Sequence, residues 1–294
     1  NQKYRLLNRT STIINCSLMQ SKLKIKFLIY FLSSIVVLVS FFPIVWLLFT
    51  SLMPAKDIYA WPPKFFPSPG TFNNYVTIFN NSPELLRYIL NSTIIAIFTT
   101  VTIILFGGLA AYALVRIKFR GSFAIMLGML AVSMFPNIAI LPAIFMVFKK
   151  LNLINSYPSL IIAHTGLFIT MAIWILANYI RTIPFEIEDA AKIDGCGPFG
   201  IFWRIILPLS KPGIFATGLI VFIFSWNEFP LSLVLLHDND MRTAPVGISL
   251  YPGEYSFPWE TISTATFLSI IPVLIITGIF QKQIIGGLTS GSNK

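Results

Sequence analysis

The chain has 294 residues, of which 55% are hydrophobic and only 11% are charged. A soluble domain carries about a quarter charged residues, so this composition predicts a polytopic membrane protein with a single membrane domain. Its two cysteines, Cys16 and Cys196, are too far apart in sequence to suggest a disulfide framework or a metal site. The net charge of +10 is spread over several polar segments, which is typical of membrane topology and argues against nucleic-acid binding.

Six segments are apolar enough to cross the hydrocarbon core as helices, which takes about 20 residues. They cover residues 27–52, 88–115, 122–148, 159–180, 213–236 and 262–281. The first is too long for a cleavable signal peptide, and no small-residue cleavage site follows it. We therefore predict an all-α fold with six transmembrane helices over residues 27–281. A basic N-terminal segment (1–26) precedes this domain, and a short tail (282–294) follows it.

The distribution of Lys and Arg predicts the orientation, because cytoplasmic loops are enriched in them. If the N-terminus lies inside, the inner segments hold fifteen of the 21 basic residues. We therefore expect both termini in the cytoplasm. The basic pair Lys149 and Lys150 is then an exception on the outer side. The proline-rich loop after the first span is expected to be irregular and to lie outside as well.

The cytoplasmic connection 181–213 has the signals of two short helices rather than of a flexible linker. Thr182 as the N-cap, Pro184 in the first turn and several acidic residues predict the start of the first helix. Glu188 is four residues before Lys192, so the two side chains could pair on the exposed side of this helix.

Gly195 interrupts the first helix, and a second one is predicted over about 199–206, before Pro208 prevents its continuation. The small side chains of Ala190 and Ala191 would let another surface approach the backbone closely. Two interpretations follow from the residues alone. The loop is either a docking surface for another protein or an interfacial hairpin that only re-orients the chain.

One set of residues in this connection follows a fixed spacing, with gaps of three and then nine residues. Its members are Asp189, Ala190, Ala191, Gly195, Ile205, Leu207 and Pro208. The spacing resembles the EAA loop of permeases of bacterial ATP-binding-cassette importers, with Asp189 in place of the usual glutamate. Four further segments are similar to the maltose-type, carbohydrate-uptake subfamily: NSTIIAIFTT (91–100), GGLAAYALVRIKFRG (107–121), MFPNIAILP (134–142) and SWNEFPLSL (225–233).

This resemblance covers roughly residues 27–291 and implies an importer permease fold in the bacterial cytoplasmic (inner) membrane. It implies four kinds of partner: the lipid bilayer, a homologous second permease, an ATPase dimer and an extracytoplasmic solute-binding protein. The loop at about 184–208 would be the coupling element, with Asp189 to Gly195 as the docking turn and Ile205 to Pro208 as its membrane-side buttress. The outer loop 237–260 would face the binding protein.

The sequence contains no G-x-x-x-x-G-K-[ST] phosphate loop, so we expect no ATP hydrolysis by this chain. Movement of the docked ATPase would instead drive alternating access of the bundle. We accordingly expect no catalytic residue, no metal site and no bound cofactor here, with ATP and Mg in the partner ATPase.

Glu228 lies well inside the fifth predicted span, where a carboxylate costs about 2.5–3.5 kcal/mol to insert. It should therefore face the bundle or a watery cavity. With Trp226 to stack on a sugar and Asn227 to hydrogen-bond, it predicts a substrate path. The alternative is subunit packing, in which Glu228 bonds to the second permease. His164 in the fourth span has either a helix-packing role or a role as a proton relay.

The resemblance implies an importer permease for sugars or oligosaccharides. One alternative is an importer for another solute such as glycerol phosphate. An alternative of a different class is a proton-coupled secondary transporter that uses Glu228 and His164. A membrane-embedded enzyme has no support, because the sequence suggests no nucleophile–base pair and no clustered ligand set.

Overall fold

The computed structural model describes the backbone of residues 2–117, 119–251 and 257–289, and all regular structure in these residues is helical. Four helices are long and apolar enough to cross a membrane, and two bent helix pairs raise the number to six if each pair forms one span. The four long helices are α1 (Gln2–Ser51, apolar from Ile25 onward), α4 (Glu84–Arg116), α7 (Tyr157–Arg181) and α14 (Trp259–Thr289). The predicted all-α fold is confirmed.

The third span is broken, whereas the sequence predicted one helix over residues 122–148. The helices α5 (Ser122–Ser133) and α6 (Asn137–Lys150) meet at 97° across a short break. Pro136 lies at this break with extended backbone, and its ring cannot donate the hydrogen bond that a continuous helix needs there. Pro142, in contrast, lies inside α6.

The fifth span is also interrupted, so the prediction of one helix over 213–236 was wrong. The helix α11 (Lys211–Asn227) ends before Glu228, whose backbone is extended, and the short helix α12 (Pro230–Leu235) follows. Pro230 has no N–H to bond the carbonyl four residues earlier, so a helix cannot run through it without losing a bond. At its other end, α11 meets the helical segment Pro198–Leu209 at 80°.

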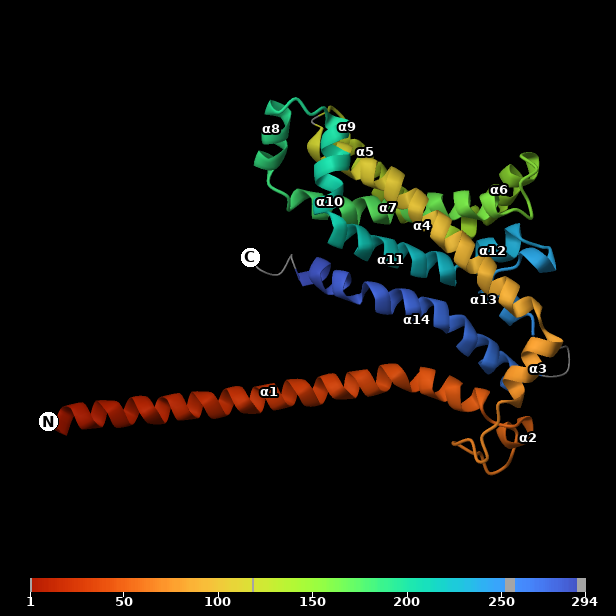
Figure 1. Cartoon of the computed structure of the whole chain (residues 1–294), viewed down its shortest axis with the longest axis horizontal. Coiled ribbons are helices and arrows are strands. Elements are labelled where there is room, and N and C mark those ends of the chain that lie inside the picture. The colour runs from red at the N-terminus through yellow and green to blue at the C-terminus, as the bar shows by residue number, and fades with distance from the viewer. Residues whose placement is uncertain (1, 118, 252–256, 290–294) are drawn as a thin grey trace.

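The helices α4 and α7 pack along each other at the centre of the bundle, and α11 packs against both. On its other side α11 contacts α14, which in turn contacts α1. Figure 1 shows this order, with α1 along one edge of the bundle. None of the residues in the most apolar stretch of α1 is buried within this chain.

Both ends of the described backbone lie at the end of the bundle that carries α8 (Phe185–Ile193), as the predicted topology requires (Figure 1). The opposite end carries four short helices: α2 (Ala55–Ile58), α3 (Asn73–Asn81), the 3-10 helix η2 (Asn239–Met241) and α13 (Ala244–Ser249). Two of these, α2 and α3, lie in the loop that the sequence predicted to be irregular.

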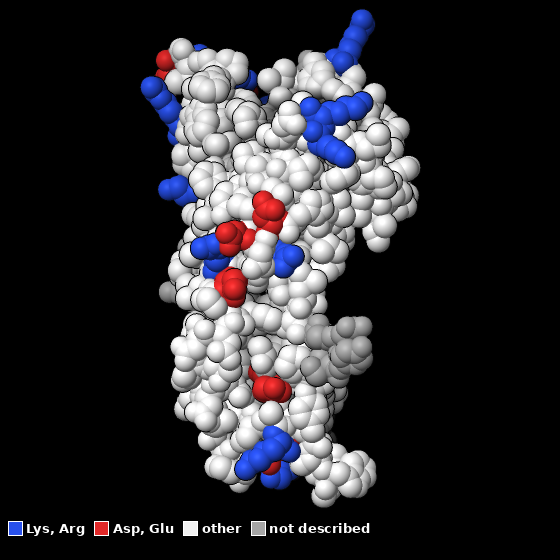
Figure 2. All heavy atoms as spheres, turned by 90° about the vertical axis from the view of Figure 1, so that its right-hand side faces the viewer, with Lys and Arg blue, Asp and Glu red and all other residues white. Residues whose placement is uncertain are grey.

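Figure 2 looks onto that opposite end and shows small groups of basic and acidic side chains on a largely uncharged surface. Two ion pairs belong to this end. Arg87 pairs with Asp240, and Lys64 pairs with Asp57 at 2.7 Å.

Candidate functional site

The connection between α7 and α11 folds into two short helical segments, as the sequence predicted. The first is α8, and the second consists of α9 (Pro198–Ile201), a π-helical turn η1 (Phe202–Ile206) and α10 (Leu207–Leu209). The second segment passes through Pro208 instead of stopping before it. In the π turn, the N–H of Leu207 bonds the carbonyl of Phe202, five residues earlier. A wide turn of this kind lets the helix absorb a residue that cannot donate its own hydrogen bond.

Two predicted details of α8 were wrong. Thr182 is not its N-cap, because the Thr182 hydroxyl donates back to the carbonyl of Tyr179 at the end of α7 (2.7 Å), and Pro184 occupies the N-cap position. The expected pair between Glu188 and Lys192 does not form either. The Lys192 ammonium donates to Asp189 (2.8 Å), and Glu188 turns into the protein.

The end of α8 explains why the motif needs glycine four residues after its second alanine. The N–H of Cys196 bonds the carbonyl of Ala191 (2.9 Å), and the N–H of Gly195 bonds the carbonyl of Lys192 (3.0 Å). These two bonds form a Schellman motif, which requires a left-handed residue after the last helical turn. Gly195 supplies it with φ of +82°.

The motif residues differ in exposure. Asp189, Ala190, Gly195 and Pro208 are exposed, Ala191 is buried, and Ile205 and Leu207 are half-buried. Large apolar side chains are exposed beside them: Phe185, Ile193 and Phe199, with Ile193 at 87%. Charged side chains surround these apolar groups on α8, so the surface is not that of a lipid-facing helix. It has the composition expected of a protein-binding surface.

The second segment is attached to the bundle by apolar packing. Ile201, Phe202 and Ile206 are at most 2% exposed and pack in a cluster with side chains of α4 and α7. Within this cluster the ring of Phe202 lies 5.5 Å from that of Tyr112 of α4. The cluster therefore holds α9 and η1 against the two central helices.

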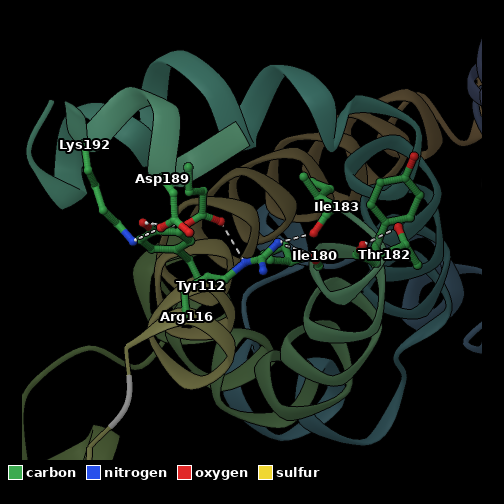
Figure 3. Close-up of polar contacts among 9 residues, drawn as sticks. Tyr112, Arg116, Ile180, Thr182, Ile183, Asp189 and Lys192 are labelled. Carbon is green, nitrogen blue, oxygen red and sulfur yellow. Dashed lines mark hydrogen bonds and ion pairs between the residues drawn. The ribbon is translucent and has the colours of Figure 1, made fainter. Parts of the chain in front are cut away.

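A buried ion pair attaches the first segment. The Nε of Arg116, the last residue of α4, lies 2.7 Å from Oε1 of Glu188, and both side chains are 2–3% exposed. The Nη2 of Arg116 also donates to the carbonyls of Ile180 (2.9 Å) and Ile183 (2.6 Å), as Figure 3 shows. The ring of Phe185 covers the guanidinium, with its centroid 3.9 Å from Cζ. Arg116 is not part of the spaced motif, and no signal in the sequence around it predicts this role.

His164, Ser225 and Glu228 form a cluster of polar side chains between the fourth and fifth spans. Nε2 of His164 lies 3.2 Å from Oε2 of Glu228, and Nδ1 lies 2.8 Å from the hydroxyl of Ser225. Glu228 in turn accepts the N–H groups of Leu231 (2.7 Å) and Ser232 (3.0 Å), so its carboxylate caps the first turn of α12. His164 was predicted to have either a helix-packing role or a role as a proton relay. Its contact with Glu228 is compatible with both roles, because it joins two helices and also brings the imidazole to the carboxylate that a relay would use.

The three residues of the predicted substrate path differ in access. Trp226 is 4% exposed and stacks on Phe222, and the Glu228 side chain is 9% exposed. Asn227 is exposed, and its amide donates to the carbonyl of Ile223 in its own helix (2.8 Å). Asn227 and Glu228 line a cavity of about 380 Å³ between α6, α7 and the α11–α12 break.

Comparison with known proteins decides the family. The sequence model of the family described as "Binding-protein-dependent transport system inner membrane component" matches residues 103–288, well over half of the chain. The chain belongs to this family. It is therefore an inner membrane transport component, and the resemblance to carbohydrate-uptake importer permeases is confirmed.

Two curated relatives of this inner membrane component match over nearly their whole length. The sulfoquinovosyl glycerol transport system permease protein SmoH of Agrobacterium fabrum is 38% identical, over 89% of this chain and 92% of that protein. The trehalose/maltose transport system permease protein MalG of Thermococcus litoralis is 36% identical, over 87% and 92%. A chain in a crystal structure of a bacterial ABC transporter involved in the import of alginate, an acidic polysaccharide, has the same fold. It aligns with a TM-score of 0.74 and 23% identity, over 87% of this chain and 94% of that chain.

Proposed function

We propose that this chain is the permease subunit of an ATP-driven importer for sugars or oligosaccharides. Its support is the set of relatives that match almost end to end, whose names refer to sugars or a sugar-bearing glycerol. An importer for glycerol phosphate or another solute is the alternative within the same family, and a solute screen distinguishes the two.

The exposed surface of α8 supports the part of this proposal that concerns coupling to an ATPase. Asp189, Ala190 and Gly195 present small or charged groups outward, and exposed Phe185 and Ile193 provide apolar contact area beside them. An interfacial hairpin would bury its apolar side chains at the lipid headgroups, but charged side chains surround them on α8. A separate ATPase docked on this surface would cover them, and Ile205, Leu207 and Pro208 would support the docked segment from the membrane side.

In the proposed assembly the chain works with a homologous permease, a pair of ATPase subunits and an extracytoplasmic binding protein. ATP and Mg bind in the ATPase pair, and this chain binds neither. The α8 end of the bundle, with both chain termini, lies in the cytoplasm, as the bias of Lys and Arg toward that end supports. The opposite end, seen in Figure 2, faces the binding protein through the segment 237–260.

Within the proposed transport path, Asn227 is the side chain of this chain that meets the solute. It is exposed and borders the cavity between α6 and the α11–α12 break. Glu228 lines the same cavity, and Trp226 supports the path from the core of the bundle. Trp226 is stacked in the core, and the carboxylate of Glu228 is occupied by bonds within the chain.

Co-purification tests the coupling role. A tag on this chain, expressed with its neighbouring transport genes, should recover an ATPase in wild-type protein. Ala190→Trp should lose it, because the indole would keep the docked surface from the backbone of α8. Ala55→Trp, the same substitution at an exposed site at the opposite end, should retain it. Recovery of the ATPase by Ala190→Trp in wild-type amounts would contradict the docking surface.

A second experiment tests the class of transporter. Liposomes that contain this chain alone should take up no radiolabelled maltose or trehalose when a proton gradient is applied. Uptake under those conditions would contradict the importer proposal in favour of a proton-coupled carrier.

A further inference from the structure

The two segments of the coupling loop are fastened to the bundle in different ways. α9 and η1 are fastened by the apolar cluster described above. Of the nine residues of α8, only Glu188 and Ala191 are buried. Ala191 contributes a single methyl group to the cluster, and half-exposed Phe185 places its ring over Arg116. Glu188, paired with that same arginine, is therefore the main polar attachment of α8 to the rest of the molecule.

The partner of Glu188 is bonded to three parts of the chain at once. Arg116 belongs to the end of α4, it pairs with Glu188 of α8, and it donates to the carbonyls of Ile180 in α7 and Ile183 in the turn that follows. Figure 3 shows the guanidinium of Arg116 beside the carbonyls of Ile180 and Ile183. The hydroxyl of Tyr112, one turn earlier on α4, lies 3.4 Å from the second carboxylate oxygen of Glu188.

Stability alone does not account for this arrangement. Burying two charges costs desolvation that their attraction only roughly offsets, and apolar residues of similar volume often serve stability equally well. A buried pair differs from apolar packing in being directional, since a guanidinium bonds its acceptors in fixed positions. Solvent and salt also screen it little. The ion pair therefore holds α8 at one position relative to α4 and α7, whereas apolar contacts alone would allow α8 to shift along these helices.

We infer that Arg116 and Glu188 are positioning residues that transmit displacement of α8 to α4 and α7. This inference rests on the proposed function, in which a docked ATPase moves α8. Because the guanidinium bonds α8, the end of α4 and the end of α7 together, these parts move as one body. The central helices α4 and α7 pack along each other through the membrane, so a movement at their ends reaches the interior of the bundle.

The test uses the assembled complex, purified through a tag on this chain and placed in nanodiscs. ATP is trapped in the ATPase with vanadate, and hydrogen–deuterium exchange is compared with and without trapping. In wild-type protein, trapping should change exchange in α8 and at the ends of α4 and α7. In Glu188→Gln, α8 should still respond, and the response of α4 and α7 should fall about tenfold. Glu186→Gln removes an exposed carboxylate from the same helix and should behave as wild type.

A double variant separates coupling from folding. Glu188→Gln leaves the Arg116 charge buried without its partner, which could prevent assembly. Arg116→Met with Glu188→Leu removes both charges, so the complex should assemble while α4 and α7 still fail to respond. Wild-type responses of α4 and α7 in both variants would overturn the inference. Failure of both to assemble would assign the pair to folding and overturn it equally. Absence of an ATPase from the wild-type preparation would instead contradict the proposed function.

Discussion

Replacement of Gly213 by alanine should destabilise the protein, although alanine is the better helix former. Gly213 lies in the first turn of α11, directly against Tyr179 near the end of α7. An added Cβ would lie 2.5 Å from Cγ of Tyr179 and 3.0 Å from its Cβ. Rotation of the tyrosine ring cannot relieve a contact with its own Cβ and Cγ, so the two helices must separate.

The expected magnitude follows from two opposing effects. Overpacking of a tight contact costs about 1–3 kcal/mol, and alanine regains up to about 1 kcal/mol of helix propensity. Gly218→Ala in the same helix is the matched control, because its added Cβ would lie no closer than 3.4 Å to another atom, Cγ2 of Thr100. This control keeps the gain in propensity without the clash. The free energies of unfolding of the two variants should therefore differ by about 1–3 kcal/mol.

The assay is thermal unfolding of the purified complex, followed by tryptophan fluorescence at fixed detergent and protein concentrations. Since 1 kcal/mol shifts Tm by about 2–4 °C in a domain of 150–250 residues and by less in a longer chain, Gly213→Ala should melt a few degrees below Gly218→Ala. Equal melting temperatures, or a higher one for Gly213→Ala, would refute the close approach of α7 and α11 as the reason for glycine at this position.

Three further predictions concern the loop and the buried polar cluster. Gly195→Ala places alanine in a left-handed conformation at a cost of about 1–2 kcal/mol, so less ATPase should co-purify than with wild type. Gly195→Asn should recover more ATPase than Gly195→Ala, because asparagine tolerates this conformation better. Equal recovery by the wild type and both variants would contradict the turn geometry. Glu228→Ala should lower Tm by several degrees, because the buried N–H groups of Leu231 and Ser232 lose their acceptor at a cost of about 1–3 kcal/mol each. Asn227→Ala is the control and should melt near the wild type. Asp189→Glu should keep both Tm and ATPase recovery, since the exposed pair with Lys192 contributes under about 1 kcal/mol; a loss of recovery would show that the docked surface requires the shorter side chain.

The sequence predicted the two short helices of the connection between α7 and α11 correctly because their signals are local. Charge counting, helix breakers and the fixed spacing each depend on residues within one segment, and they predicted α8, the glycine turn and the second helix. The same local rules failed for Glu188. At four residues from Lys192 it looked like a member of an exposed helical pair, but its partner Arg116 is distant in sequence and adjacent only in the fold.

Local sequence rules also missed features of the membrane spans. Hydropathy located the third and fifth spans, but it averages over windows and therefore missed the breaks near Pro136 and after Asn227. Glu228 was expected to line a substrate path or to bond to a second permease, because a carboxylate is costly to bury in the membrane. The chain itself supplies His164 and the first N–H groups of α12, which only the folded arrangement brings together.

The two broken spans have a consequence for how the chain enters the bilayer. α5 has 12 residues and α6 has 14, so each is about 18–21 Å long and cannot cross a hydrocarbon core of about 30 Å. The unpaired backbone groups at such a break are tolerated only when neighbouring protein or water satisfies them. The apolar segments of α1, α4, α7 and α14 are each long enough to insert without help. Biogenesis should therefore proceed in two stages, in which the four continuous helices insert independently and the broken spans settle once the others have assembled.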